Sequence, residues 1–216
     1  DNIAIGYEAM TTDTAGGTLN IALGNYALDA LTSGDYNVGV GHNALSANST
    51  GGENTAIGHE ALLTNTTASE NTAVGFQALK LNTTGTGLVA MGRLANHKNT
   101  TANDNTAIGF QALRETTTGA DNTALGSAAL YTNTTGARNT GLGHDALYTN
   151  ATVSDNTAVG WHALRVNVAA ANTAVGANAL SNNTTAVENV AVGMNALTAA
   201  TTGTGNHAFG FKALET

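Results

Sequence analysis

A nine-residue pattern of apolar and polar positions, Asn-Thr-Ala-Val-Gly-x-x-Ala-Leu, recurs along the whole chain. We number positions from its glycine, so that Asn stands at −4, a β-branched residue at −3, Ala at −2, an apolar residue at −1, Ala at +3 and Leu at +4. Ten of the twelve intervals between successive glycines are 17 residues long. The thirteen glycines are Gly6, Gly24, Gly41, Gly58, Gly75, Gly92, Gly109, Gly126, Gly143, Gly160, Gly176, Gly193 and Gly210. Such a period predicts a repeat architecture.

The segment that ends at this glycine predicts a strand of four or five residues, because β-branched residues favour strands and Asn and Gly bound every repeat. A 17-residue unit cannot hold two helices and a turn. Since side chains alternate along a strand, we expect positions −3 and −1 to fill an interior with the Leu at +4, and −2 to face the other way. The sequence predicts an all-β fold, a parallel β-solenoid (β-roll or β-helix) of thirteen coils of about 17 residues, as one array over 1–216.

Position −2 is Ala or Gly in every repeat, and this uniform smallness predicts that another backbone packs closely against it. That backbone belongs either to a sister chain in a homotrimer or to the coil's own second strand. Aromatic residues gather at +1, and we interpret them as a subunit interface rather than a receptor-contact face. The candidate interface residues are Ala56, Ala73, Ala107, Ala124, Phe76, Phe110 and Trp161.

Composition removes several classes of function. The chain has no Cys, so disulfides, thiolate nucleophiles and Cys-ligated metals are excluded. A net charge of −8 disfavours nucleic acid as a partner, and no apolar run approaches the ~20 residues of a membrane span. No catalytic constellation stands out, so we expect no enzyme, no cofactor and no metal site. We interpret His42 and His59 on adjacent coils as incidental, and carboxylates at −5, such as Glu53 and Glu70, as a solvated turn rather than a Ca²⁺ site.

Basic and aromatic residues alternate at +5, where a solenoid would place successive side chains at steps of ~4.8 Å. This column is the candidate ligand-binding edge, suited to acidic glycans or other polyanions through ion pairs and ring stacking. Its members are Lys80, His97, Arg114, Tyr131, Tyr148 and Arg165.

Asn-x-Ser/Thr sequons also recur in step with the repeat, although turn chemistry explains them more simply than sugar attachment. The candidate glycosylation sites are Asn48, Asn65, Asn82, Asn99, Asn133 and Asn150. The coil of Gly92 departs most from the pattern, with Leu88 at −4 and Asn96 at +4, and is either a functional candidate or a decayed repeat.

Residues 1–6 (DNIAIG), 20–24 (NIALG) and 189–193 (NVAVG) resemble the repeats of trimeric autotransporter adhesin heads. The longer run 122–136 is more similar to the repeat arrays of phage tail fibres and large bacterial surface proteins. The resemblance implies a left-handed parallel β-roll that trimerises and carries adhesion, although a period of 17 residues is longer than the usual adhesin-head coil. It covers the whole chain and is more specific for fold than for function.

We therefore expect a rigid extracellular fibre segment with an adhesive or receptor-binding role, on a virion tail fibre or a bacterial cell surface. Its partners would be copies of itself, as a homotrimer or an end-to-end filament, and a cell-surface glycan or receptor. The alternative is a purely structural extracellular filament, with or without attached glycans. Ice binding, which uses Thr arrays on solenoids, ranks lower, because the Thr column at −3 is interrupted and is predicted to face inward.

Overall fold

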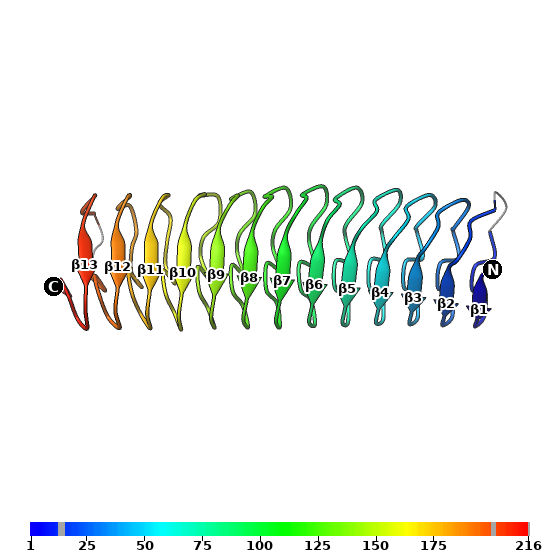
Figure 1. Ribbon diagram of the computed structural model, residues 1–216, viewed down its shortest axis with the longest axis horizontal. Coiled ribbons are helices and arrows are strands. Elements are labelled where there is room, and N and C mark those ends of the chain that lie inside the picture. The colour runs from blue at the N-terminus through cyan, green and yellow to red at the C-terminus, as the bar shows by residue number, and fades with distance from the viewer. Residues whose placement is uncertain (13–15, 200–201, 216) are drawn as a thin grey trace. The chain divides into compact units, whose positions relative to one another are not determined.

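The computed structural model describes residues 1–12, 16–199 and 202–215 in two compact units, Asp1–Ala107 (unit 1) and Ile108–Thr216 (unit 2). Each unit is a stack of coils that contribute one short strand apiece (Figure 1). Unit 1 holds β1 (Ile3–Ile5), β2 (Ile21–Leu23), β3 (Val38–Val40), β4 (Thr55–Ile57), β5 (Thr72–Val74) and β6 (Val89–Met91). Unit 2 holds β8 (Thr123–Leu125), β9 (Thr140–Leu142), β10 (Thr157–Val159), β11 (Thr173–Val175), β12 (Val190–Val192) and β13 (His207–Phe209), and β7 (Thr106–Ile108) contains the boundary.

Within each unit, neighbouring strands pair in parallel with equivalent repeat positions opposite each other, as Thr55 is to Thr72 and Thr140 to Thr157. This confirms an all-β parallel β-solenoid. No helix occurs in the described ranges, so none there could cross a membrane. The strands have three residues rather than four or five, because the Asn at −4 turns into the coil and the glycine at 0 leaves the extended region.

The core of each coil is narrow and contains the small residue at −2, the Ala at +3 and the Leu at +4. Ala56, Ala61 and Leu62 are all fully buried. A side chain at −2 faces the Leu of a neighbouring coil, since a Cβ at Gly39 would lie 3.3 Å from Leu28 Cγ. The strand therefore has the opposite phase to the one predicted: −2 points inward, and −3 and −1 point outward.

Two columns of buried Asn side chains run through each unit beside this core. In the column at −4, Asn54 Nδ2 donates to Asn37 Oδ1 at 3.1 Å and to the carbonyl of Ala68 at 2.8 Å. In the column at +7, Asn65 Nδ2 donates to Asn48 Oδ1 at 3.1 Å and to the same Ala68 carbonyl at 2.9 Å. One carbonyl thus ties both amide ladders together, and the buried Nδ2 groups of Asn54 and Asn65 each find two acceptors.

The shortened repeat between Gly160 and Gly176 loses its residue from a turn. Thr157 still pairs with Thr173, so the strand register is preserved. Asn167 Nδ2 donates to the carbonyl of Ala169, two residues ahead, where its equivalents donate three residues ahead.

Candidate functional site

The outward side chains at −3 and −1 form a regular surface over the strands of each unit, which we call the strand face. None of the strands in the part of the chain that the structure describes contains Asp, Glu, Lys or Arg. Its −1 side chains are partly or well exposed, with Ile57 at 41%, Leu125 at 48% and Val175 at 37%. An exposed apolar surface of this regularity indicates an interaction site, and sequence reasoning had placed these residues in the core.

The Ala column predicted as a subunit interface lies inside the chain. Its four predicted residues are completely buried and cannot touch another chain. They are Ala56, Ala73, Ala107 and Ala124. The smallness at −2 is explained by the opposite wall of the coil. The three aromatic residues predicted with them are exposed at +1, and their role as an interface stays a prediction. They are Phe76, Phe110 and Trp161.

In unit 2 the +5 column forms a continuous stack of cations and rings. The rings of Tyr131 and Tyr148 are parallel, with centroids 5.1 Å apart. The guanidinium of Arg114 lies 5.5 Å from the Tyr131 centroid, and that of Arg165 lies 5.8 Å from the Tyr148 centroid. Each ring thus has one face against the other ring and one against an arginine. Because neither face is free for a sugar, this column can offer a ligand only ring edges, hydroxyls and the remaining N–H groups of the two arginines. Arg114 Nη1 already lies 2.7 Å from Glu115 Oε1, and Arg165 Nε lies 3.5 Å from Asp145 Oδ2.

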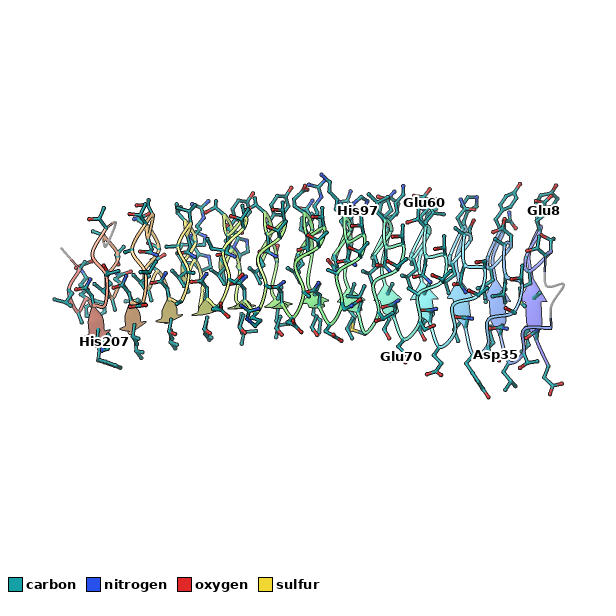
Figure 2. The ribbon with its side chains drawn as sticks, turned by 90° about the horizontal axis from the view of Figure 1, so that it is seen from above. Glu8, Asp35, Glu60, Glu70, His97 and His207 are labelled. Carbon is teal, nitrogen blue, oxygen red and sulfur yellow. The ribbon has the colours of Figure 1, made fainter. Side chains whose placement is uncertain are left out.

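In unit 1 the +5 residues are involved in other contacts. Lys80 Nζ lies 2.8 Å from Glu60 Oε2, and Gln77 Nε2 donates to the same oxygen at 2.8 Å. The hydrogen bond from Lys80 is the main reason that the pKa of Glu60 is lowered, and Gln77 adds to it against the effect of burial. His97 lies on the same side of the coils as Glu60, whereas Asp35 and Glu70 point to the opposite side (Figure 2). Ligand binding by Lys80 and His97 stays a prediction.

A second column of rings follows the +1 and +2 positions of unit 1. Tyr7 and Tyr26 meet edge to face with centroids 5.5 Å apart, and His42 and His59 stack at 5.2 Å. Phe76 stacks on His59 at 5.3 Å. These contacts stabilise the turns at the coil edge, and they show that neighbouring coils align their side chains here.

The six sequon asparagines belong to the buried ladder at +7. All six are fully buried: Asn48, Asn65, Asn82, Asn99, Asn133 and Asn150. Asn65 uses its Nδ2 to donate to two acceptors, the side-chain oxygen of Asn48 and the carbonyl of Ala68. An N-linked sugar would replace one of these hydrogens inside a closed coil. The burial therefore argues against glycosylation of the folded array.

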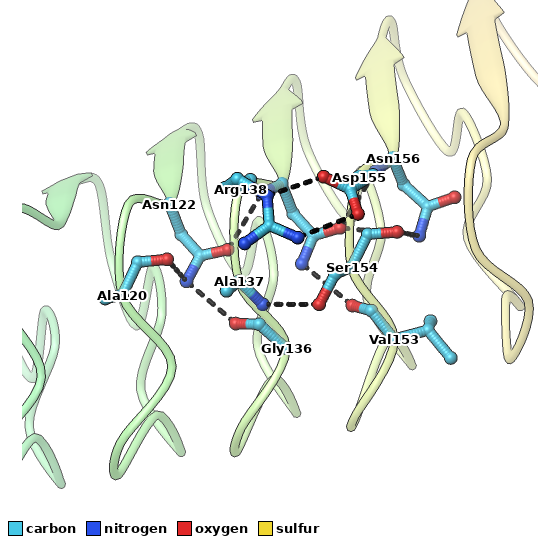
Figure 3. Close-up of polar contacts among 10 residues, drawn as sticks. Ala120, Asn122, Gly136, Ala137, Arg138, Val153, Ser154, Asp155 and Asn156 are labelled. Carbon is cyan, nitrogen blue, oxygen red and sulfur yellow. Dashed lines mark hydrogen bonds and ion pairs between the residues drawn. The ribbon is translucent and has the colours of Figure 1, made fainter.

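The charged residues at −5 lie in turns with positive φ, on the surface of each unit. Arg138 donates from Nε and Nη2 to the two carboxylate oxygens of Asp155 on the next coil, at 2.7 and 3.0 Å (Figure 3). This pairing lowers the pKa of Asp155. Beside it, Ala137 N donates to Ser154 Oγ at 3.0 Å. In this stretch the column links coils by ion pairing.

Two histidines and one carboxylate meet on neighbouring coils of unit 2. His144 Nδ1 lies 3.4 Å from Asp145 Oδ1, and His162 Nε2 lies 3.5 Å from Asp145 Oδ2. Desolvation lowers the pKa of His162, Arg165 and His144 lower it further, and Asp145 raises it. Sequence reasoning weighed the pair His42 and His59 and did not bring these three residues together. The missed signal was that Asp145 and His162 both stand at +2, one coil apart.

The irregular coil of Gly92 keeps the backbone pattern but exchanges two core side chains. Leu88 at −4 and Asn96 at +4 are both fully buried, in positions that Asn and Leu fill in most other coils. Neither the Nδ2 nor the Oδ1 of Asn96 has a hydrogen-bond partner. This coil is a local weakness in unit 1, because unpaired buried amide groups destabilise the folded state.

Models of protein families, curated proteins and solved structures all give no match to this chain.

Proposed function

We propose that this chain is a rigid segment of an extracellular fibre, in which the strand face packs against further copies of the chain in a homotrimer. The observation that supports this most is the absence of charge from the strand face. Solvent-facing strands ordinarily carry charged residues that prevent association. Burying the Thr, Val, Ile and Leu side chains of this face against another chain would stabilise the assembly by roughly 25 cal/mol per Å² of apolar surface removed from water.

The regularity of the strand face favours a copy of the chain over an unrelated partner. Every coil presents the same two columns at the ~4.8 Å spacing of hydrogen-bonded strands. A second copy has the same spacing and can repeat one contact coil after coil, and a symmetric oligomer brings identical surfaces together. Three copies and left-handed coils are what the resemblance to adhesin heads and tail fibres implies.

The adhesive part of the proposal rests on the surfaces that vary between coils. A fibre needs an invariant side for assembly and can vary its other sides to contact a receptor. In unit 2, the guanidinium groups of Arg114 and Arg165 and the hydroxyl groups of Tyr131 and Tyr148 would meet an acidic glycan. The alternative is a purely structural filament whose varied columns bind nothing.

The decisive experiment is the mass of the particle in solution, measured by light scattering for the wild type and for a variant of the strand face. Leu125→Lys with Val159→Lys places charges on two outward positions of unit 2. We expect three chains per particle for the wild type and one for this variant, with the circular dichroism spectrum unchanged. Thr118→Lys, an exposed turn substitution, is the matched control and should remain trimeric.

A wild-type monomer at micromolar concentration would overturn the trimer, and so would a double variant that stays trimeric. Open-ended particles with the same length distribution in the wild type and in the double variant would favour the end-to-end filament.

Ice binding is a second candidate function, because the structure removes one reason for ranking it low. The Thr column at −3 faces outward, and β8 to β11 carry Thr-x-aliphatic in four successive strands, with Thr123, Thr140, Thr157 and Thr173 aligned. Ice binding needs this face free in a monomer, whereas fibre assembly covers it. Thermal hysteresis that Thr140→Lys abolishes would support ice binding, and a trimer without hysteresis would exclude it.

A further inference from the structure

Backbone geometry brings three metal-binding side chains together on two coils of unit 2. Asp145 and His162 both occupy position +2, with φ of 56° and 57°, and His144 precedes Asp145 at +1. The backbone N–H of His162 donates to the carbonyl of His144 at 3.0 Å, which fixes the two coils in register at this point. The three residues thus rest on hydrogen-bonded turns.

Their donor atoms are spaced as the ligands of one ion would be. Each carboxylate oxygen of Asp145 lies 3.4 or 3.5 Å from an imidazole nitrogen, one from His144 and one from His162. In a tetrahedral site with bonds of 2.0–2.1 Å, ligand atoms are about 3.4 Å apart. One donor atom from each residue can be chosen so that all lie within 4.8 Å of one another. Small side-chain rotations would bring these three donor atoms to the distances at which they can coordinate one metal ion.

We propose that His144, Asp145 and His162 bind Zn²⁺, with the remaining coordination position open to water or to a donor from another molecule. Two imidazoles and one carboxylate suit a borderline divalent ion, whereas Ca²⁺ and Mg²⁺ prefer oxygen ligands throughout. His144 is exposed and the other two are half-buried, so an ion can enter from solvent. The site does not depend on the fibre function, because all of its ligands come from one chain.

Arg165 is the group that opposes an ion here. Its Nε lies 3.5 Å from Asp145 Oδ2, so the arginine and a metal compete for the same carboxylate. Removing the guanidinium would leave the three ligands in place and take away a positive charge. If the cluster served only as a network of ion pairs, losing Arg165 would not be expected to raise its affinity for a metal ion.

Trp161 provides a direct optical probe of the site. It is the single Trp of the chain, and its ring stacks on the imidazole of His162. We expect Co²⁺ at neutral pH to quench its fluorescence with micromolar affinity, and Zn²⁺ to reverse the quenching by competition. Ca²⁺ and Mg²⁺ should not compete. Absent quenching, or displacement by Ca²⁺ as easily as by Zn²⁺, would overturn the proposal.

Four variants assign the ligands, with thermal unfolding as the check on folding and Zn²⁺ titration calorimetry as a second readout. Asp145→Asn and His162→Gln should each weaken Co²⁺ and Zn²⁺ binding at least about tenfold. Arg165→Ala should strengthen both. His59→Gln, which alters the stacked histidine pair of unit 1, is the matched control and should change neither. Undiminished binding in Asp145→Asn, or weaker binding in Arg165→Ala, would contradict the site.

Discussion

The glycine at position 0 is the residue that tolerates least change in a coil. At Gly58, φ is +138°, and a Cβ would lie 2.5 Å from the carbonyl oxygen of Gly75 on the next coil. Turn positions that carry side chains, such as Glu60 and Leu62, have φ of 56° and 51°, in the left-handed helical region that residues other than glycine can adopt. The φ of +138° at Gly58 lies in a region that is essentially restricted to glycine. Both the backbone conformation and the close contact between coils therefore require glycine here.

Gly58→Ala should destabilise the protein by more than about 3 kcal/mol, the range in which large steric effects fall. Gly210→Ala is the matched control: its φ of +122° is also positive, but a Cβ there meets nothing within 4 Å. The control retains only the backbone strain, about 1–3 kcal/mol. Urea unfolding of both variants measures the difference, and equal losses would show that strain outweighs the contact with the next coil.

Glu60 should make stability fall in acid. Its pKa is lowered in the folded state, chiefly by Lys80, so below the ordinary glutamate pKa the unfolded chain binds more protons than the folded one. The stabilisation is complete above that ordinary value and is lost as pH falls through the folded pKa. In Lys80→Met the loss should be smaller. Urea midpoints at neutral and acid pH test this, and an identical acid loss in both proteins would contradict it.

At the scale of the element, amide ladders add to the backbone hydrogen bonds that hold successive coils together. A strand of three residues forms few ladder bonds, and the Asn columns at −4 and +7 add buried hydrogen bonds at every step. Asn54 shows the arrangement, since it accepts from the backbone of Asn71 while donating to Asn37 and Ala68. The coil therefore depends on polar groups that are buried and paired.

Asn54→Ala should cost at least about 2 kcal/mol, because it leaves an N–H and a carbonyl group with fewer partners inside the coil. Thr50→Ala, at an exposed turn position nearby, is the control and should be nearly neutral. Thermal or urea unfolding gives both values. A neutral Asn54→Ala would mean that water replaces the ladder without cost.

The sequence predicted the coil and its period, but the predicted phase of the strand was wrong. Val and Ile are more apolar than Ala, so hydrophobicity alone predicts that the side chains at −3 and −1 face the interior. What decides the phase is the width of the coil, which has room only for Ala against Leu, as Gly39 and Leu28 show. The uniform smallness at −2 did indicate a close backbone, yet one strand cannot reveal whose backbone it is.

The candidate sites were predictable to different degrees. The column of Arg114, Tyr131, Tyr148 and Arg165 was predicted as a column because the period aligns +5 on every coil. That the two rings would cover each other depends on side-chain rotamers, which spacing does not show. In the triad around Asp145, Asp145 and His162 share the +2 column one coil apart, whereas His144 stands at +1, so no single column of the repeat holds all three.

At the scale of the whole molecule, each unit is a series of nearly equivalent interfaces between coils. In such an array, stability is approximately a sum of coil terms and neighbour terms. Deleting a whole coil should then leave a folded protein, provided that the residues joined by the deletion occupy consecutive repeat positions. The existing 16-residue repeat shows that one residue less in a turn leaves the strand register unchanged.

Deleting residues 122–138 should give a folded protein, because it joins Asp121 to Asn139 and keeps −5 followed by −4. Deleting residues 122–130 instead brings Tyr131 to a position that Asn fills, and this variant should fail to fold around the junction. Circular dichroism and the midpoint of thermal unfolding compare the two. Equal stability would show that repeat phase does not control the fold.

The coil of Gly92 has a mechanical consequence. Hydrogen bonds between coils point along the direction in which the coils are stacked, so tension between β1 and β6 would load all the bonds of one interface together. Rupture then begins at the interface with the least resistance. The buried, unpaired amide of Asn96 marks that place in unit 1, and a pulling experiment should find the first break there, with Asn96→Leu raising the force required.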